Sequence, residues 1–210
     1  MSQRQPADTE PFDALKTAKV TGPLGIIAGR GSLPMFIADA ATAGNVPVHI
    51  IGIRGEAKDE IERFPHTWIK WGEVGKIFAA LEKHGCNDLV IIGGVSRPDF
   101  KNIRVDVGAL KALPFLLSLR KGGDDHVLSR VVDFFEQRGY RVHGAGDVLP
   151  ELLMPEGTLT QHAPSAEDEA DMALAFKVVR VLGQLDIGQA AVVASGHVLA
   201  VEAAEGTDAM

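Results

Sequence analysis

The sequence is poor in cysteine and contains no long apolar run, and both shortages restrict its class. Cys86 is the single cysteine among 210 residues, so an internal disulfide bond is excluded. We interpret this cysteine, which precedes an apolar segment, as a structural residue. No run of about 18 apolar residues is present, and such a run is what a membrane-spanning helix requires.

The sequence also lacks an excess of positive charge. Its 21 Lys and Arg residues face 28 Asp and Glu residues, giving a formal net charge of −7. Because phosphate backbones are bound by clustered cations, this balance argues against a nucleic-acid partner. Residues 1–23 are polar, have no apolar signal segment, and are expected to form a flexible tail. We therefore expect a cytoplasmic protein that is at most peripheral to a membrane.

The first informative stretch is a short apolar strand from Leu24 that ends in a glycine-rich turn before a helix start at Pro34. Glycine lets a backbone approach a ligand, and a helix N-terminus offers N–H groups and partial positive charge. Gly29, Gly31 and Ser32 are therefore candidates for phosphate binding. A tight turn without a ligand would have the same sequence, so both interpretations stay open at this point.

A nicotinamide-binding fold is the obvious comparison for such a turn, and two residues argue against it. The third glycine of the dinucleotide pattern is replaced by Pro34, and the second strand, residues 46–53, is followed by Arg54 instead of an acidic residue. An NAD-dependent oxidoreductase is therefore the less favoured alternative.

Two further glycine loops follow predicted strands. Lys76 lies at the start of a helix after the strand of residues 66–71, and Arg97 lies in the loop after the apolar strand of residues 89–92. Parallel strands place such loops at one edge of a sheet, where open α/β sheets bind ligands. The pattern predicts a Rossmann-like, mostly parallel α/β domain over residues 24–144. Lys76 is equally consistent with a solvated first-turn lysine.

Two helices are predicted near the end of this domain, and the sequence allows two roles for each. Residues 107–121 predict an apolar helix, with core packing as the default and contact with acyl chains or a bilayer surface as the alternative. Asp124 and Asp125 begin the next helix, whose expected buried stripe includes Leu128. Helix capping and the helix dipole explain both aspartates, and so does a divalent metal or an activated water.

The remaining residues predict a smaller α+β domain. Residues 145–165 are rich in Pro, Gly and small side chains and are expected to be a linker. A helix over 166–182, with Ala170 and Val181 among its apolar positions, precedes two short strands that turn near Gly196. One helix and one hairpin form a thin core, so we expect a domain that is incomplete or is completed by a partner chain, as in a homodimer.

Six blocks in order over residues 24–210 resemble the UDP-2,3-diacylglucosamine pyrophosphatase family of lipid A biosynthesis, of the type unrelated to calcineurin-like phosphoesterases. The blocks are IAGRGSLP at 27–34, GEVGKI at 72–77, VSRPDF at 95–100, GDD at 123–125, DIGQ at 186–189 and EAAEGTDAM at 202–210. The resemblance implies Mg²⁺-dependent hydrolysis of UDP-2,3-diacylglucosamine to UMP and 2,3-diacylglucosamine 1-phosphate at the inner face of the cytoplasmic membrane. It also implies two domains with the ligand between them, and a further segment after Met210 that carries an essential aspartate, so we expect this chain to be an incomplete form.

Under this resemblance the candidate residues receive roles. The expected catalytic residues are Asp124, Asp125 and Asp208, and the expected metal ligands are Asp125, Glu205 and Asp208. The expected substrate-binding residues are Gly29, Gly31, Ser32, Lys76, Arg97, Gln189 and Thr207. A nucleotide-sugar binding module without catalysis is the alternative from a different class.

Overall fold

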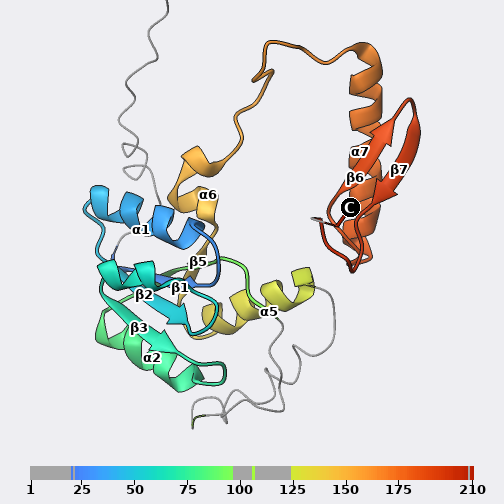
Figure 1. Ribbon diagram of the computed structural model, residues 1–210. Helices are drawn as coiled ribbons and strands as arrows, with labels where there is room; N and C mark the ends of the chain where they lie inside the picture. The colour runs from blue at the N-terminus through green and yellow to red at the C-terminus, as the bar shows by residue number, and fades with distance from the viewer. Residues whose placement is uncertain (1–19, 21, 97–105, 107–123, 208) are drawn as a thin grey trace, which may run out of the picture. The chain divides into compact units, whose positions relative to one another are not determined.

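The computed structural model describes residues 20, 22–96, 106, 124–207 and 209–210, which form two compact units (Figure 1). Of the described residues, the first unit comprises 20, 22–96, 106 and 132–154, and the second comprises 124–131, 155–207 and 209–210. Each unit has its own sheet, with five strands in the first and two in the second.

The sheet of the first unit is fully parallel and has the order β3-β2-β1-β4-β5. Its strands are β1 (Leu24–Ala28), β2 (Val48–Ile53), β3 (His66–Ile69), β4 (Asp88–Ile92) and β5 (Arg141–His143). The chain proceeds outward from β1 to β3 and then returns to the other side of β1 with β4. The order reverses between β1 and β4, where open α/β sheets bind ligands at the carboxyl edge. The predicted Rossmann-like parallel sheet is confirmed.

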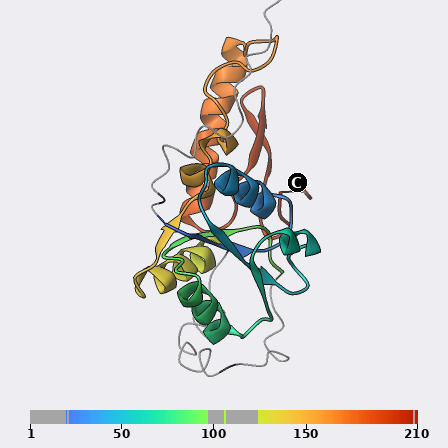
Figure 2. The ribbon, with the colours of Figure 1, turned by 90° about the vertical axis from the view of Figure 1, so that its left-hand side faces the viewer.

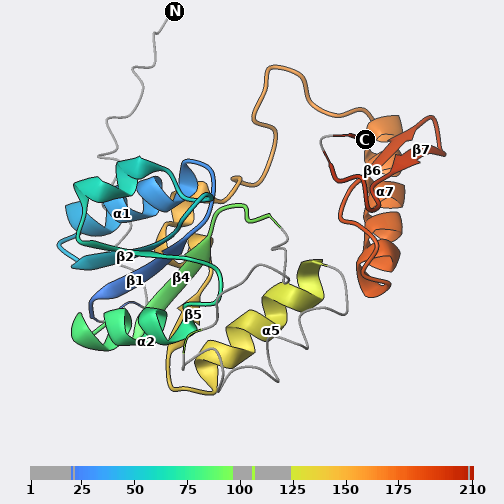
Figure 3. The ribbon, with the colours of Figure 1, turned by 60° about the horizontal axis from the view of Figure 1, so that its bottom comes forward.

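Helices cover both faces of this sheet (Figures 2 and 3). Helix α1 (Leu33–Ala43) and the short α6 (Ala145–Val148) lie on one face, and α2 (Val74–Lys83) and the C-terminal half of α5 (Asp124–Glu136) lie on the other. Phe78 of α2 contacts Phe134 and Phe135 of α5, with ring centroids 5.8 and 5.5 Å apart. Coverage on both faces explains why the central strands are mostly apolar.

A glycine in β2 lets a short helical segment pack directly on the sheet. The 3₁₀ segment η2 (Asp59–Arg63) places Ile61 against Gly52. A Cβ atom at Gly52 would lie 2.2 Å from Ile61 Cδ1 and 2.9 Å from the nearest ring atom of Trp68. The position therefore requires glycine for steric reasons.

Helix α6 and the following 3₁₀ segment η3 (Pro150–Leu152) occupy residues that we expected in the linker. Val148 and Leu149 are buried in the core beneath α1, and residues up to Met154 belong to the first unit. The expected linker of residues 145–165 is thus corrected at its beginning. A four-residue helix that follows Gly144, contains Gly146 and is closely followed by Pro150 has the composition of a loop.

The second unit contains α7 (Ala166–Gln184) and a hairpin of β6 (Ala191–Ala194) and β7 (His197–Val201). Ser165 and Asp168 form a capping box at the start of α7: the Ser165 N–H donates to Asp168 Oδ2 at 2.8 Å, and the Asp168 N–H donates to Ser165 Oγ at 3.2 Å. Helix α7 packs against β6. The predicted small α+β unit and its hairpin are confirmed.

The apolar residues of the second unit are mostly exposed. Val181 and Leu128, both expected in buried stripes, have 54% and 51% of their surface exposed, and Ala170 is exposed as well. Among the described residues of this unit, Glu202 alone is buried. No helix in the described ranges combines the length and apolar character needed to cross a bilayer.

Candidate functional site at the carboxyl edge of the sheet

Two loops meet at the carboxyl ends of β1 and β4. The Arg30 N–H donates to the Gly94 carbonyl at 2.7 Å, and the Gly94 N–H donates to the Arg30 carbonyl at 3.1 Å. This pair of hydrogen bonds holds the loop after β1 against the loop after β4. The switch point of the sheet is therefore covered by two backbones in direct contact.

Gly29 makes that contact sterically possible. A Cβ atom there would lie 2.4 Å from the Gly94 carbonyl oxygen and 2.8 Å from that of Gly93. Gly31 adopts a φ of +99°, a conformation that side chains disfavour. The backbone geometry alone therefore accounts for glycine at positions 29 and 31, and their binding of a phosphate stays a prediction.

Helix α1 begins at the same edge. Ser32 is its N-cap and is exposed, and its hydroxyl forms no capping hydrogen bond with the helix. The Met35 and Phe36 N–H groups instead donate to the Ser32 carbonyl at 3.0 and 3.2 Å. The hydroxyl and the positive end of the helix dipole are consequently both presented where an anion is expected.

A buried carboxylate joins three loops at this edge. The side chain of Glu56, in the turn after β2, is 7% exposed. Its Oε2 lies 3.1 Å from Arg30 Nη1, and its Oε1 accepts the Ser96 N–H at 3.0 Å. The Ser96 hydroxyl accepts a further hydrogen bond from Arg30 Nη1. None of these three residues was among the sequence-based candidates.

Two other cations near the sheet have partners of their own. Lys76 Nζ lies 3.8 Å from Glu73 Oε2 on the surface of α2, a helix that follows β3, and β2 separates β3 from β1. Arg54 lies over the Trp68 ring, with Cζ 5.1 Å from its centroid. The structure therefore gives Lys76 a local ion pair, and its predicted contact with phosphate is untested.

In the second unit, Glu202 brings two of the candidates together. Its Oε1 accepts a hydrogen bond from the Thr207 hydroxyl at 2.6 Å, and its Oε2 accepts the Gln189 N–H at 2.8 Å. These hydrogen bonds, that of Thr207 first, hold the pKa of Glu202 below its usual value. Glu202 is thus the anchor of the loops that carry Gln189 and Thr207, and it was not among the sequence-based candidates.

The remaining candidates are placed only in part. Arg97 and Asp208 lie outside the described residues, as does the predicted apolar helix of residues 107–121. Asp124 and Asp125 begin α5, as predicted, but only their backbone is described.

The described residues contain no group of three or more His, Cys, Asp or Glu side chains suited to a metal ion. Glu205, the one expected metal ligand whose side chain is described, accepts the Ala203 N–H at 3.1 Å. A magnesium site made by Asp125, Glu205 and Asp208 therefore stays a prediction.

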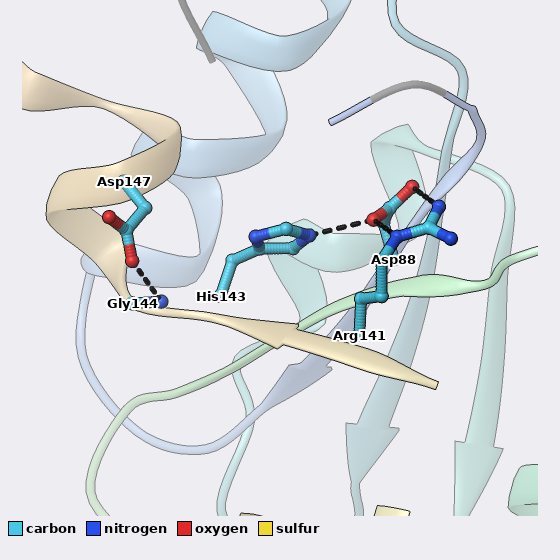
Figure 4. A network of polar contacts seen from close by, with 5 residues as sticks. All are labelled: Asp88, Arg141, His143, Gly144 and Asp147. Carbon is cyan, nitrogen blue, oxygen red and sulfur yellow. Dashed lines mark hydrogen bonds and ion pairs between the residues drawn. The ribbon is translucent and has the colours of Figure 1, made fainter. Parts of the chain in front are cut away.

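The opposite, amino edge of the sheet holds a structural network (Figure 4). Asp88, fully buried at the start of β4, accepts hydrogen bonds from Arg141 Nε and Nη2 at 2.8 and 2.7 Å, and its Oδ1 lies 2.7 Å from His143 Nε2. Burial raises the pKa of Asp88, but the hydrogen bonds from Arg141 and His143 outweigh it and leave the pKa below its usual value. The network fixes the short edge strand β5 to β4.

A second buried polar group lies in β2. His49 is 3% exposed, its Nε2 lies 2.9 Å from Thr67 Oγ1, and its ring stacks on His84 with centroids 3.8 Å apart. Burial first, and then the charges of His84, His66 and Lys83, lower the pKa of His49 to about 4.

Cys86 is buried on the same side of the sheet as α2, near Leu81 and Leu89. Burial raises the pKa of its thiol to about 11. Because the thiolate is the reactive form of cysteine, the burial of Cys86 supports its interpretation as a structural residue.

Comparison with known proteins agrees with this division of the chain. Residues 23–152 match the family model for the LpxI N-terminal domain, and residues 155–210 match that for the LpxI C-terminal domain. The chain belongs to the LpxI family. The boundary between the two LpxI domains coincides with the end of η3 and with the division of the structure into two units.

A curated LpxI relative is 44% identical over 187 residues, which cover 89% of this chain and 67% of the relative. That protein is the UDP-2,3-diacylglucosamine pyrophosphatase LpxI of Caulobacter vibrioides (strain ATCC 19089 / CIP 103742 / CB 15). The resemblance found in the sequence is therefore confirmed at the level of the family.

Proposed function

We propose that this LpxI-family chain hydrolyses the pyrophosphate bond of UDP-2,3-diacylglucosamine, giving UMP and 2,3-diacylglucosamine 1-phosphate in lipid A biosynthesis. The observation that carries the proposal is the match to both LpxI domains, together with 44% identity to a relative that is named for this activity. The geometry of the carboxyl edge supports it, because Gly31, Ser32 and the start of α1 provide a setting for a phosphate group.

Hydrolysis of a pyrophosphate requires that charge on the phosphate oxygens be neutralised and that a water be directed at one phosphorus. We assign phosphate contacts to Gly29, Gly31, Ser32, Lys76 and Arg97, and further hydrogen bonds to Gln189 and Thr207. We assign the water to Asp124, Asp125 and Asp208. The proposal includes Mg²⁺ held by Asp125, Glu205 and Asp208, since carboxylates are its usual protein ligands, and the bound ion would neutralise phosphate charge.

The substrate of the relative carries two acyl chains, which favour a bilayer. The proposal therefore includes transient contact with the inner face of the cytoplasmic membrane, in a Gram-negative cell, and a homodimer as the assembly. Flotation with phospholipid vesicles tests the membrane contact, and analytical ultracentrifugation tests the dimer.

The test of the activity is UMP release from UDP-2,3-diacylglucosamine, measured by chromatography with Mg²⁺ and with EDTA. We expect release with Mg²⁺ and its loss with EDTA. Asp125→Asn is expected to lower turnover at least tenfold at an unchanged melting temperature, whereas the control Asp133→Asn, an exposed position of the same helix, is expected to keep wild-type turnover.

Binding of UDP without hydrolysis under either condition would contradict the proposal and favour the nucleotide-sugar binding module. Equal losses of turnover and melting temperature in Asp125→Asn would indicate that Asp125 only stabilises the start of the helix.

A further inference from the structure

The carboxyl edge contains an arginine that is held on one side and open on the other. The Arg30 side chain is 53% exposed although its Nη1 lies 3.1 Å from a carboxylate that is almost fully buried. Full burial with Glu56 would cost the guanidinium its hydration, and Arg30 avoids this cost by staying partly exposed. Its side chain therefore remains accessible at the switch point of the sheet.

Glu56 is placed to orient this arginine. Its Oε1 is fixed by the Ser96 N–H, and its Oε2 accepts no directed hydrogen bond in the described part of the chain although Arg30 Nη1 is 3.1 Å away. Nη1 also donates to the Ser96 hydroxyl. Two contacts at one nitrogen hold the guanidinium, and no side-chain contact of Nε or Nη2 occurs within the described residues. These two nitrogens are left for another anion, which a planar guanidinium can bind with two parallel hydrogen bonds.

Gly94 keeps that free edge uncovered. A Cβ atom at Gly94 would lie 3.6 Å from Arg30 Nη2 and 3.7 Å from Nε, in van der Waals contact with the two nitrogens. The residue is exposed and has no positive φ, so the backbone does not demand glycine at this position. A side chain as large as leucine at this position would start beside the two nitrogens and compete with an anion for the space next to them.

We infer that Arg30 is a phosphate-binding residue of the carboxyl edge, that Glu56 is the positioning residue that orients its guanidinium, and that Gly94 leaves the open edge accessible. The ligand is a phosphate group of a nucleoside diphosphate. The inference rests on the proposed function for the nucleotide, and it adds a cation that directly adjoins the Gly29 loop.

The experiment measures binding of UDP and of uridine to the full chain by isothermal titration calorimetry. Arg30→Ala is expected to raise the Kd for UDP at least tenfold and to leave the Kd for uridine unchanged, because uridine has no phosphate. Gly94→Leu, which keeps the ion pair, is expected to weaken UDP binding similarly. The control Arg63→Ala removes an exposed arginine paired with Asp39 at 3.3 Å and should leave both constants within twofold.

Glu56→Gln tests the positioning role, since glutamine keeps an acceptor for the Ser96 N–H and removes the charge. We expect a UDP Kd raised severalfold with an unchanged uridine Kd, a separation that a purely structural loss would not produce. Circular dichroism spectra that match wild type establish that each variant is folded.

Three results would overturn the inference: UDP binding within twofold of wild type in Arg30→Ala, equal losses for UDP and uridine, or a wild type that binds UDP no better than uridine. UMP release by the wild type separates the two proposals. Release together with unimpaired UDP binding in Arg30→Ala refutes the inference alone, whereas absence of release together with UDP binding that needs Arg30 refutes the proposed activity alone.

Discussion

The buried imidazole of His49 makes the stability of the first unit depend on pH in a defined window. Its pKa is about 4 in the folded chain against 6.5 in an unfolded one. The unfolded chain therefore takes up a proton near pH 6.5, and the folded chain takes it up only near pH 4. Stability contributed by neutral His49 is present above pH 6.5 and is lost as the pH falls toward 4.

The size of the effect follows from the pKa difference. Each unit corresponds to about 1.4 kcal/mol, so the whole window amounts to about 3 kcal/mol of unfolding free energy. The substitution His49→Gln removes the titration and keeps a side chain that can hydrogen bond to Thr67 Oγ1. Between pH 6.5 and 4.5 we expect the variant to lose about 2 to 3 kcal/mol less than wild type.

Urea unfolding followed by tryptophan fluorescence measures this directly, because the two tryptophans, Trp68 and Trp71, both lie in the first unit. His197→Gln, at an exposed position in the hairpin of the second unit, is the matched control and should follow the wild-type curve. Parallel pH curves for wild type and His49→Gln would refute the reasoning. They would mean that the buried ring exchanges its proton as readily as a solvated one.

Three further substitutions have definite outcomes. Asp88→Asn should lower the unfolding free energy of the first unit by about 2 to 3 kcal/mol, because it removes the charge that Arg141 and His143 bind. The control Asp147→Asn, at an exposed helix cap, should lower it by under about 1 kcal/mol in the same urea assay. Gly29→Ala should cost about 1 to 3 kcal/mol there by pushing the two loops apart, and unchanged stability would contradict the close approach. Glu202→Leu should accelerate hydrogen exchange at the Gln189 amide at least tenfold, as measured by mass spectrometry on peptides of the second unit, and unaltered exchange would show that the carboxylate is not its partner.

The fold was largely predictable because its signals are local. Continuous apolar strands, glycine at strand ends and Pro34 in a first helical turn indicated a parallel sheet with crossover helices, which the structure confirms. Helix α6 was missed because its stability comes from Val148 and Leu149 packing beneath α1. The exposure of Val181 was not predicted, because helical periodicity identifies an apolar face of a helix but does not show whether another element packs on that face.

The candidate site was less predictable because its contacts join distant segments. Arg30 and Glu56 are 26 positions apart, and Glu56 begins a charged stretch that resembles a solvated loop. Glu202 likewise shows its role only when Gln189 and Thr207 are placed beside it. The available signals in the sequence were Arg30 between two glycines and Glu202 directly after an apolar strand. Neither identifies its partner without the fold.

The absence of a side chain at Gly52 should make positions 52 and 61 evolve together. Ile61 comes closest to the space that a β-carbon at Gly52 would need, so Gly52 cannot gain a side chain while Ile61 keeps its length. Substitutions to alanine at position 52 should occur in relatives only together with a shorter side chain at position 61. In an alignment of LpxI sequences, positions 52 and 61 should therefore covary, and this covariation would reveal the packing of η2 on β2 from sequence alone.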